Sequence, residues 1–153
     1  MVKKKDEIKI NKKHGGKEFT NSFRFVGLVK PVRKKDPETD SWYDVEIYET
    51  TVTQTKKNRR VLQFSIETAP YNELKVELAG MERDLVYAYS SKHKKTVTVP
   101  WADRNDKTKL PDETYHVITP EWDMAEQLAK IVKPDMWVEV QGQYEFDSFE
   151  NNN

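Results

Sequence analysis

The feature that most constrains the fold is the stretch from Thr119 to Phe149, because it predicts one helix that runs directly into one strand. Thr119 can accept hydrogen bonds from the first free amides of a helix, and Pro120 suits the first turn, where no donor is needed. The apolar residues that follow recur at the spacing of one helical face, at Ala125, Leu128, Ala129 and Val132. The stretch therefore predicts a helix that buries one face.

The end of this helix and the strand after it are also predicted. The helix is expected to end at Lys133, because the residue before Pro134 is disfavoured in the helical region. Aromatic and β-branched residues alternate with polar ones from Trp137 to Phe146, which predicts a half-buried strand. Trp122 and Trp137 flank the helix, and we expect both rings to hold it against a sheet.

The first predicted strand begins near residue 21 and ends at Pro31. Gly27 lies in the middle of this strand, and a glycine there is typical of a bulge or a sharp bend. Residues 33–41 are charged and turn-forming, so they predict a loop.

A hairpin and a third strand are predicted next, from runs at 42–54, 59–69 and 73–80. Apolar and polar residues alternate in each run, which indicates strands with one buried face. The residues expected to point inward are Val45, Ile47, Leu62, Phe64, Ile66, Leu74, Val76 and Leu78.

The domain organisation follows from these patterns. Residues 1–20 are rich in lysine and predict a flexible basic arm, and residues 21–150 predict one domain. A long insertion at about 81–118 holds a short strand at 96–99, and 151–153 is a tail or a truncation point. Strands followed by one late helix predict the all-β or α+β class, as a small antiparallel β-barrel plugged by that helix.

The charge of the chain is unevenly distributed. Residues 1–35 hold 12 Lys and Arg against 3 Asp and Glu, whereas residues 111–153 hold 2 Lys against 10 Asp and Glu. Asymmetry of this kind indicates a polyanion-binding end, although a solvated basic tail explains it equally well.

Several classes of function find no support in the sequence. There is no cysteine, and no apolar run approaches the roughly 18 residues of a membrane span, so we expect no disulfides and no membrane partner. His14, His93 and His116 are isolated from one another and lack the spacing of metal ligands. No glycine-rich phosphate loop or nucleophile motif is present. We therefore expect no cofactor and no enzymatic activity, with a nuclease left open as the third alternative.

Four segments together resemble the single-stranded DNA-binding proteins of the oligonucleotide/oligosaccharide-binding (OB) fold, especially divergent phage or mobile-element forms: SFRFVGLV, RRVLQFSIETA, ELKVELAG and AEQLAKIVKPDMWVEVQGQYEF. The last is the most specific, because the family places a helix before its fourth strand and ends that strand in a V-x-V-x-G pattern, here Val138, Val140 and Gly142. The resemblance covers about residues 21–149. It implies an OB-like barrel that coats or protects single-stranded DNA in replication or recombination, in the cytoplasm of a bacterium or phage-infected cell.

The chain departs from this family in three places. The expected fifth strand does not follow the turn at 151–153, and the connection at 81–118 is longer than usual. The acidic, phenylalanine-ended tip by which bacterial members recruit other proteins is missing. Other replication proteins are therefore no more than candidate partners, and a homo-oligomer is an open alternative.

The resemblance also implies where a ligand would bind. In the family the strand crosses the second and third β-strands and is held by the adjoining loops, with cations for the phosphates and aromatic faces for the bases. On this chain these places are the loop at 33–43, the hairpin tip at 55–60 and the excursion at 87–101. The residues so implicated are Arg33, Lys34, Lys35, Trp42, Tyr43, Lys56, Lys57, Arg59, Arg60, Tyr71, Lys75, Tyr87, Tyr89, Lys92, Lys94, Lys95 and Trp101.

For some of these residues a structural role is the alternative to nucleic-acid binding. One ring of the pair Trp42 and Tyr43 is expected to face the core, because adjacent residues of a strand alternate. Trp101 lies in a charged loop, which favours a contact with a base. Each lysine cluster, taken alone, is typical of a solvated face. The acidic excess after residue 111 keeps a second function open, a protein-interaction or assembly module without nucleic-acid binding.

Overall fold

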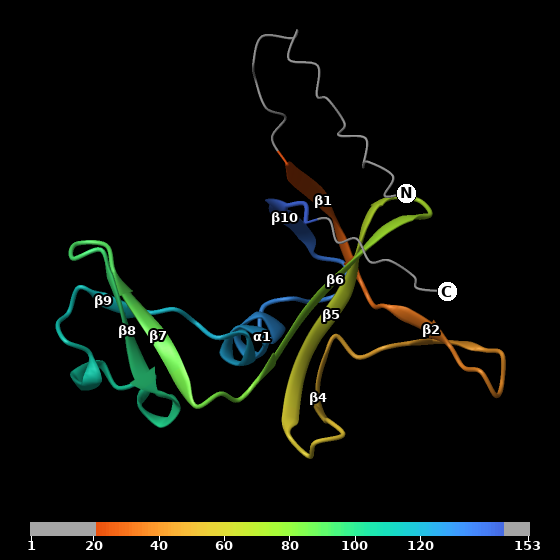
Figure 1. Cartoon of the computed structure of the whole chain (residues 1–153). Helices are drawn as coiled ribbons and strands as arrows, with labels where there is room; N and C mark the ends of the chain where they lie inside the picture. The colour runs from red at the N-terminus through yellow and green to blue at the C-terminus, as the bar shows by residue number, and fades with distance from the viewer. Residues whose placement is uncertain (1–20, 146–153) are drawn as a thin grey trace, which may run out of the picture. The chain divides into compact units, whose positions relative to one another are not determined.

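The computed structural model describes residues 21–145 of the chain (Figure 1). Two compact units are recognised within it, a body of residues 25–140 and a small unit that contains residues 21–24 and 141–145. The predicted basic arm at 1–20 and the tail at 151–153 lie outside the described residues, and the last predicted strand ends at Gln143, before its expected end at Phe146.

A five-stranded antiparallel sheet is organised around the long strand β5. One edge of β5 pairs with both β1 and β4, and the other edge pairs with β6, while β10 pairs with β1. The strands are β1 (Ser22–Lys30), β4 (Tyr48–Val52), β5 (Asn58–Ala69), β6 (Asn72–Met81) and β10 (Trp137–Gln143). Among the described residues this sheet stays open and does not close into a barrel.

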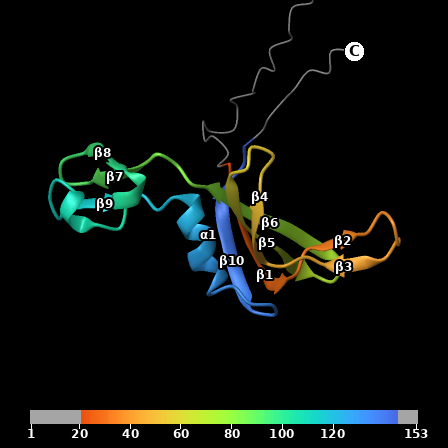
Figure 2. The same cartoon turned by 90° about the horizontal axis from the view of Figure 1, so that it is seen from below.

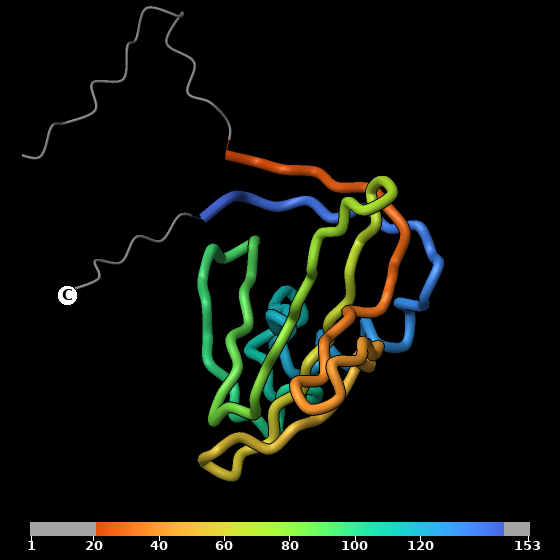
Figure 3. The backbone as a smooth tube through the Cα atoms, turned by 90° about the vertical axis from the view of Figure 1, so that its right-hand side faces the viewer, coloured from red at the N-terminus to blue at the C-terminus, as the bar shows by residue number. Residues whose placement is uncertain are grey.

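The predicted hairpin is confirmed as β4 and β5, and β6 follows as the predicted third strand (Figure 3). Leu62, Phe64 and Ile66 are buried as expected and form the main core with Val29 and Ala125. The expectation of a single buried face is wrong for β5, because its alternate residues are buried as well, including the polar Gln63 and Ser65. A central strand with neighbours on both edges leaves little of its polar face in water.

Gly27 allows a close approach between β1 and β5. It is buried within β1, and a side-chain carbon added there would lie 2.6 Å from the Cγ2 atom of Ile66 and would also meet the backbone of Glu67. The β1 and β5 backbones can pair at this point because glycine carries no side chain.

The region predicted as a loop at 33–41 and one strand at 42–54 is different in the structure. Strands β2 (Arg33–Lys35) and β3 (Trp42–Asp44) pair with each other as a separate hairpin, and β4 begins only at Tyr48 (Figure 2). The turn between them is closed by the Asp36 carboxylate, which accepts a hydrogen bond from the Glu38 amide at 2.8 Å. That bond, followed by one from the Thr39 amide, lowers the pKa of Asp36.

Helix α1 (Glu121–Ala129) is shorter than predicted at both ends. Its N-cap is Pro120 and no side chain caps it, so the capping role expected of Thr119 is wrong. The helix ends at Ala129, before Lys133, and the amides of Ile131 and Val132 both donate to the carbonyl of Leu128 just beyond it. The predicted apolar face is confirmed, since Ala125 is buried and Leu128, Ala129 and Val132 pack against the main core.

The two tryptophans that flank the helix behave differently. Trp122 is buried, as expected, and its backbone lies against Gly80 of β6. Trp137 is exposed on β10, so the expectation that it holds the helix in place is wrong.

The excursion between β6 and α1 is a second sheet with its own core. Strands β7 (Leu85–Ser90), β8 (Lys95–Pro100) and β9 (Tyr115–Val117) pair in the order β8-β7-β9, and the 3₁₀ turns η1 (Trp101–Asp103) and η2 (Lys107–Lys109) follow β8 (Figure 1). The predicted strand at 96–99 is confirmed as β8. The buried residues of this core are Val86, Ala88, Val99 and Tyr115.

Candidate nucleic-acid interface

The exposed face of the β7–β8–β9 sheet is built by strict alternation along β7. Val86, Ala88 and Ser90 are buried, whereas Leu85, Tyr87 and Tyr89 are exposed. Tyr87 and Tyr89 keep 49% and 42% of their surface accessible although they lie on the central strand. Because residues i and i+2 of a strand point to the same face, the two rings lie side by side on it.

The neighbours of these rings are short or neutral. Tyr87 pairs with Thr98, and Tyr89 pairs with Thr96 on one side and His116 on the other. Ile118 extends β9 on the same face, where its amide donates to the carbonyl of Tyr87 at 2.8 Å. None of the paired residues on this face of the described sheet is a carboxylate.

Three lysines lie at the turn that joins β7 to β8. Lys92, Lys94 and Lys95 are all exposed, and none of them takes part in an ion pair with another described residue. The turn is held by the Ser90 hydroxyl, which is buried, accepts a hydrogen bond from the His93 amide and contacts the Thr114 hydroxyl. These contacts fix the turn, so that Lys92 and Lys94 lie close in the chain to Tyr89, whereas Lys95 pairs with the buried Ser90 and lies on the opposite face of the sheet.

A second support for this turn comes from the segment before β9. The His93 ring lies 3.1 Å from the Asp112 carboxylate and is stacked on the ring of Tyr115. Hydrogen bonds from the hydroxyl and amide of Thr114, with a smaller contribution from His93, lower the pKa of Asp112. The carboxylate is thus charged throughout the neutral range and holds both segments together.

The β2–β3 hairpin carries a second group of predicted residues, all of them exposed. Trp42 keeps 59% of its surface accessible, and the Arg33 guanidinium lies 5.7 Å from the centre of its ring. The expectation that one ring of Trp42 and Tyr43 faces the core is wrong, because this hairpin pairs only with itself. Its cations are largely matched, since Arg33 faces Asp44 at 3.9 Å and Lys35 faces Asp40 at 2.6 Å.

The β4–β5 tip places its four predicted cations in three different settings. Lys56 and Lys57 are exposed, and Arg59 lies 3.5 Å from Glu77. Arg60 points toward the helix, where it donates to the Trp122 carbonyl and to the Glu126 carboxylate and lies 4.0 Å from the centre of the Trp122 ring. Arg60 thus anchors the helix to the sheet.

The outer face of β5 and β6, where the family resemblance places the ligand, is rich in carboxylates. Lys75 lies 3.3 Å from Glu77. On this face the glutamates Glu49, Glu67, Glu73 and Glu77 accompany the cations Lys30, Arg59 and Lys75. Tyr71 is fully exposed, at the turn between the two strands.

Trp101 is half-buried against the core of the small sheet. The Arg104 guanidinium covers its ring at 4.1 Å and donates to Asp123 of the helix at 2.7 and 3.2 Å. Asp123 raises the pKa of Arg104 through this contact. The Trp101 ring therefore packs within the protein, and the Arg104 guanidinium already occupies one of its two faces.

Residues of the small-sheet face that sequence reasoning missed are Thr96, Thr98, His116 and Ile118. The alternation of Val86 and Ala88 with Tyr87 and Tyr89 was visible in the sequence and could have revealed this strand. The partners on β8 and β9 could not be found in this way, because their register depends on the pairing.

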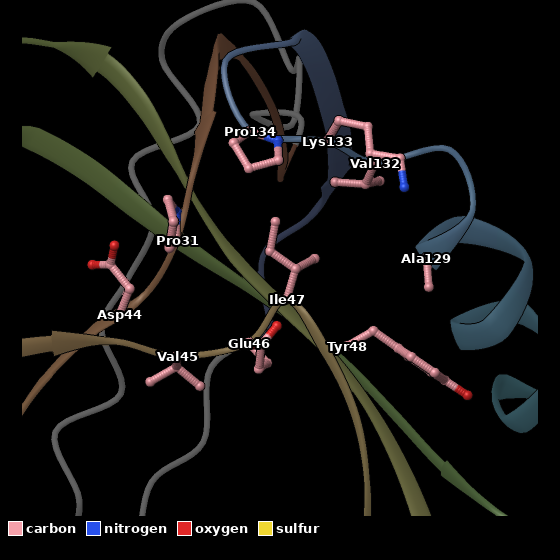
Figure 4. A pocket seen from close by; sticks show the side chains of 10 residues that line it. All are labelled: Pro31, Asp44, Val45, Glu46, Ile47, Tyr48, Ala129, Val132, Lys133 and Pro134. Carbon is pink, nitrogen blue, oxygen red and sulfur yellow. The ribbon is translucent and has the colours of Figure 1, made fainter.

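A groove of about 370 Å³ lies beside the end of α1 (Figure 4). Its lining is mainly apolar and includes Pro31, Val45, Ile47, Tyr48, Ala129, Val132 and Pro134. Within residues 21–145 no cluster of three or more His, Asp or Glu could hold a metal ion. No helix of that region is long and apolar enough to cross a membrane.

Comparison of the chain with protein-family models, with curated proteins and with solved structures found no match. The candidate site therefore rests on its own geometry, which combines exposed aromatic rings on a face without paired carboxylates with lysines at the adjoining turn.

Proposed function

We propose that the protein is a non-catalytic single-stranded DNA-binding protein that coats or protects unpaired strands during replication or recombination of a phage or mobile element. The observation that carries the proposal is the exposure of aromatic rings beside cations on elements outside the main core. Aromatic rings stack on unpaired bases of any sequence, and cations neutralise the phosphates between them.

The strand order supports an OB-like architecture as part of this proposal. Strands β1, β5 and β6 occur in this order in the chain, α1 comes later, after the β7–β8–β9 sheet, and β10 returns to pair with β1. This is the order of the first four strands of an OB barrel, with the helix between the third and fourth. In this interpretation β1 and β4 are two halves of one strand along β5, interrupted by the β2–β3 hairpin.

The test is a titration of fluorescently labelled oligo-dT by anisotropy, at low and at high salt, with a duplex of equal length as control. We expect tight binding of the single strand, weaker binding at high salt because counterions are released, and little binding of the duplex. Equal affinity for the duplex, or no binding at low salt, would overturn the proposal.

The β2–β3 hairpin favours a second candidate function, a protein-interaction module. Its ion pairs leave it close to neutral, while Trp42, Tyr43 and Arg33 belong to the residue types that dominate protein interfaces. If oligo-dT does not bind, a Trp42→Ala variant should be compared with the wild type for self-association by analytical ultracentrifugation and for capture of partner proteins.

A further inference from the structure

The two faces that could receive a single strand differ in the carboxylates that they carry. The outer face of β4, β5 and β6 carries four glutamates beside three cations, and the face of the β7–β8–β9 sheet carries no carboxylate on its paired residues. Phosphates are repelled by carboxylates that lie directly opposite, and this repulsion costs affinity wherever the strand passes.

We propose that the nucleic acid is bound on the exposed face of the β7–β8–β9 sheet, with one base stacked on Tyr87 and one on Tyr89, and not on the outer face of β5 and β6. This inference rests on the proposed function and assigns the site within it. The ligand class is a single strand whose bases are unpaired, because only unpaired bases present their faces to a ring.

The spacing of the rings suits two successive bases. Residues i and i+2 of a strand are separated by about 6.8 Å, which is roughly twice the stacking distance along a nucleic-acid strand. The single-stranded nucleic acid must therefore be extended, so that adjacent bases are unstacked from each other and each stacks on one ring. Thr96 and Thr98, which pair with Tyr89 and Tyr87, have short side chains that leave the rings accessible from the β8 side.

The lysines determine where the phosphates lie. Lys92 and Lys94 belong to the turn that follows Tyr89, whereas Lys95 pairs with the buried Ser90 and therefore lies on the opposite face of the sheet. Phosphates that flank the base on Tyr89 thus come within reach of two lysines that have no carboxylate partner in the described part of the chain. The Tyr87 end of the face lacks such a cluster, so the cations concentrate at one end of the site.

The first experiment removes the rings. A Tyr87→Ala/Tyr89→Ala variant should lose roughly 25-fold or more in affinity for oligo-dT, because stacking on each base contributes roughly 5- to 150-fold. The Tyr87→Phe/Tyr89→Phe variant keeps both rings and should bind within about twofold of the wild type. Circular dichroism and thermal unfolding of each variant show whether the sheet is retained.

The matched control is Tyr71→Ala, which removes a fully exposed tyrosine from the β5–β6 turn. We expect its affinity to equal that of the wild type. If Tyr71→Ala weakens binding and the double alanine variant does not, this inference is wrong while the proposed function stands. If the wild type binds no oligo-dT at all, both are wrong.

The second experiment removes the cations. Changing Lys92 and Lys94 together to Gln should reduce the slope of log affinity against log salt by about 1.4, since each phosphate contact to a single strand contributes about 0.7. The variant Lys56→Gln/Lys57→Gln changes an equivalent exposed turn and should leave the slope unchanged. A larger effect at Lys56 and Lys57 would place the phosphates at the β4–β5 tip and overturn the assignment.

Contact with the rings is tested directly by photo-crosslinking. An oligonucleotide that contains 5-iodouracil should crosslink to Tyr87 or Tyr89, identified by mass spectrometry of the digested complex. Crosslinks confined to peptides of β5, β6 or the β2–β3 hairpin would contradict the site.

Discussion

Single side chains join the small sheet to the rest of the body. Arg104 follows η1, stacks on Trp101 and binds the Asp123 carboxylate in the first turn of α1. Both charged side chains of this pair are mostly buried, with 18% and 17% of their surface exposed. Loss of one partner leaves the other charge without compensation in a place that water barely reaches.

Arg104→Ala is therefore expected to lower the free energy of unfolding by about 2–3 kcal/mol, somewhat less than for a fully buried pair. The measurement is urea denaturation followed by circular dichroism. Arg83→Ala is the matched control, because Arg83 binds Glu121 of the same helical turn but both side chains are well exposed. Arg83→Ala should lower the free energy of unfolding by less than about 1 kcal/mol. Equal decreases for the two variants would contradict the expectation that burial makes the Arg104 pair more important.

Two lysines at hairpin turns have a left-handed backbone, Lys56 with φ 59° and Lys94 with φ 50°. Glycine adopts this conformation without the cost that a side chain carries there. Lys56→Gly and Lys94→Gly should each raise the free energy of unfolding by about 0.5 kcal/mol. Under the proposed site, only Lys94→Gly should also weaken binding of oligo-dT, so paired stability and affinity measurements separate the turn from the ligand. Equal affinity of the two variants would argue against a phosphate contact at Lys94.

At the scale of elements, the helix can approach β6 because Gly80 has no side chain. A carbon added at Gly80 would lie 2.6 Å from the carbonyl carbon of Glu121 and would meet the Trp122 amide. These are backbone atoms at the start of α1, so relief would require movement of the whole helix. The Arg60 contacts to Trp122 and Glu126 hold the same helical turn against β5.

Gly80→Ala is expected to lower the free energy of unfolding by about 2–3 kcal/mol, as is typical of overpacking a tight contact. Thermal unfolding measures the effect. Gly142→Ala serves as the comparison, because the added carbon there would meet the Phe23 ring, a side chain that can rotate away. If Gly80→Ala lowers the free energy of unfolding no more than Gly142→Ala does, the helix can shift to accept the added carbon.

At the scale of the whole molecule, the body holds two separate hydrophobic clusters. One is centred on β5 and α1, and the other lies inside the β7–β8–β9 sheet. Structures with separate clusters open locally at different free energies. The small sheet can thus carry a binding face and still open without the larger core.

Val99→Ala should weaken the small cluster by roughly 2 kcal/mol, whereas Val29→Ala should weaken the large one. Both valines are buried, so the two changes remove the same two methyl groups from different cores. Hydrogen–deuterium exchange with mass spectrometry should show faster exchange of β7, β8 and β9 in Val99→Ala, with β5 unchanged. Faster exchange of both sheets in Val99→Ala would indicate that the body unfolds as one unit.

Much of the architecture was predictable because it depends on the spacing of apolar and polar side chains along single elements. The apolar face of α1, the β4–β5 hairpin and the inward residues of β5 all followed from the spacing of side chains along one element. The sequence did not predict that residues 33–54 contribute to two different hairpins, β2–β3 and β4–β5. Apolar and polar residues alternate in both β3 and β4, so the pattern does not show that the two strands have different partners. Sequence period reports which side a residue faces but not which strand lies beside it.

The candidate site shows the same division. The sequence by itself determined which rings and cations were available, and that Tyr87 and Tyr89 alternate with apolar residues. Tertiary structure alone decided that Arg60 turns toward Trp122, that Arg104 covers Trp101, and that glutamates crowd the outer face of β5 and β6. The physical reason is that charge and accessibility at a surface depend on neighbours from distant segments, whose register is set by strand pairing and by packing of the core.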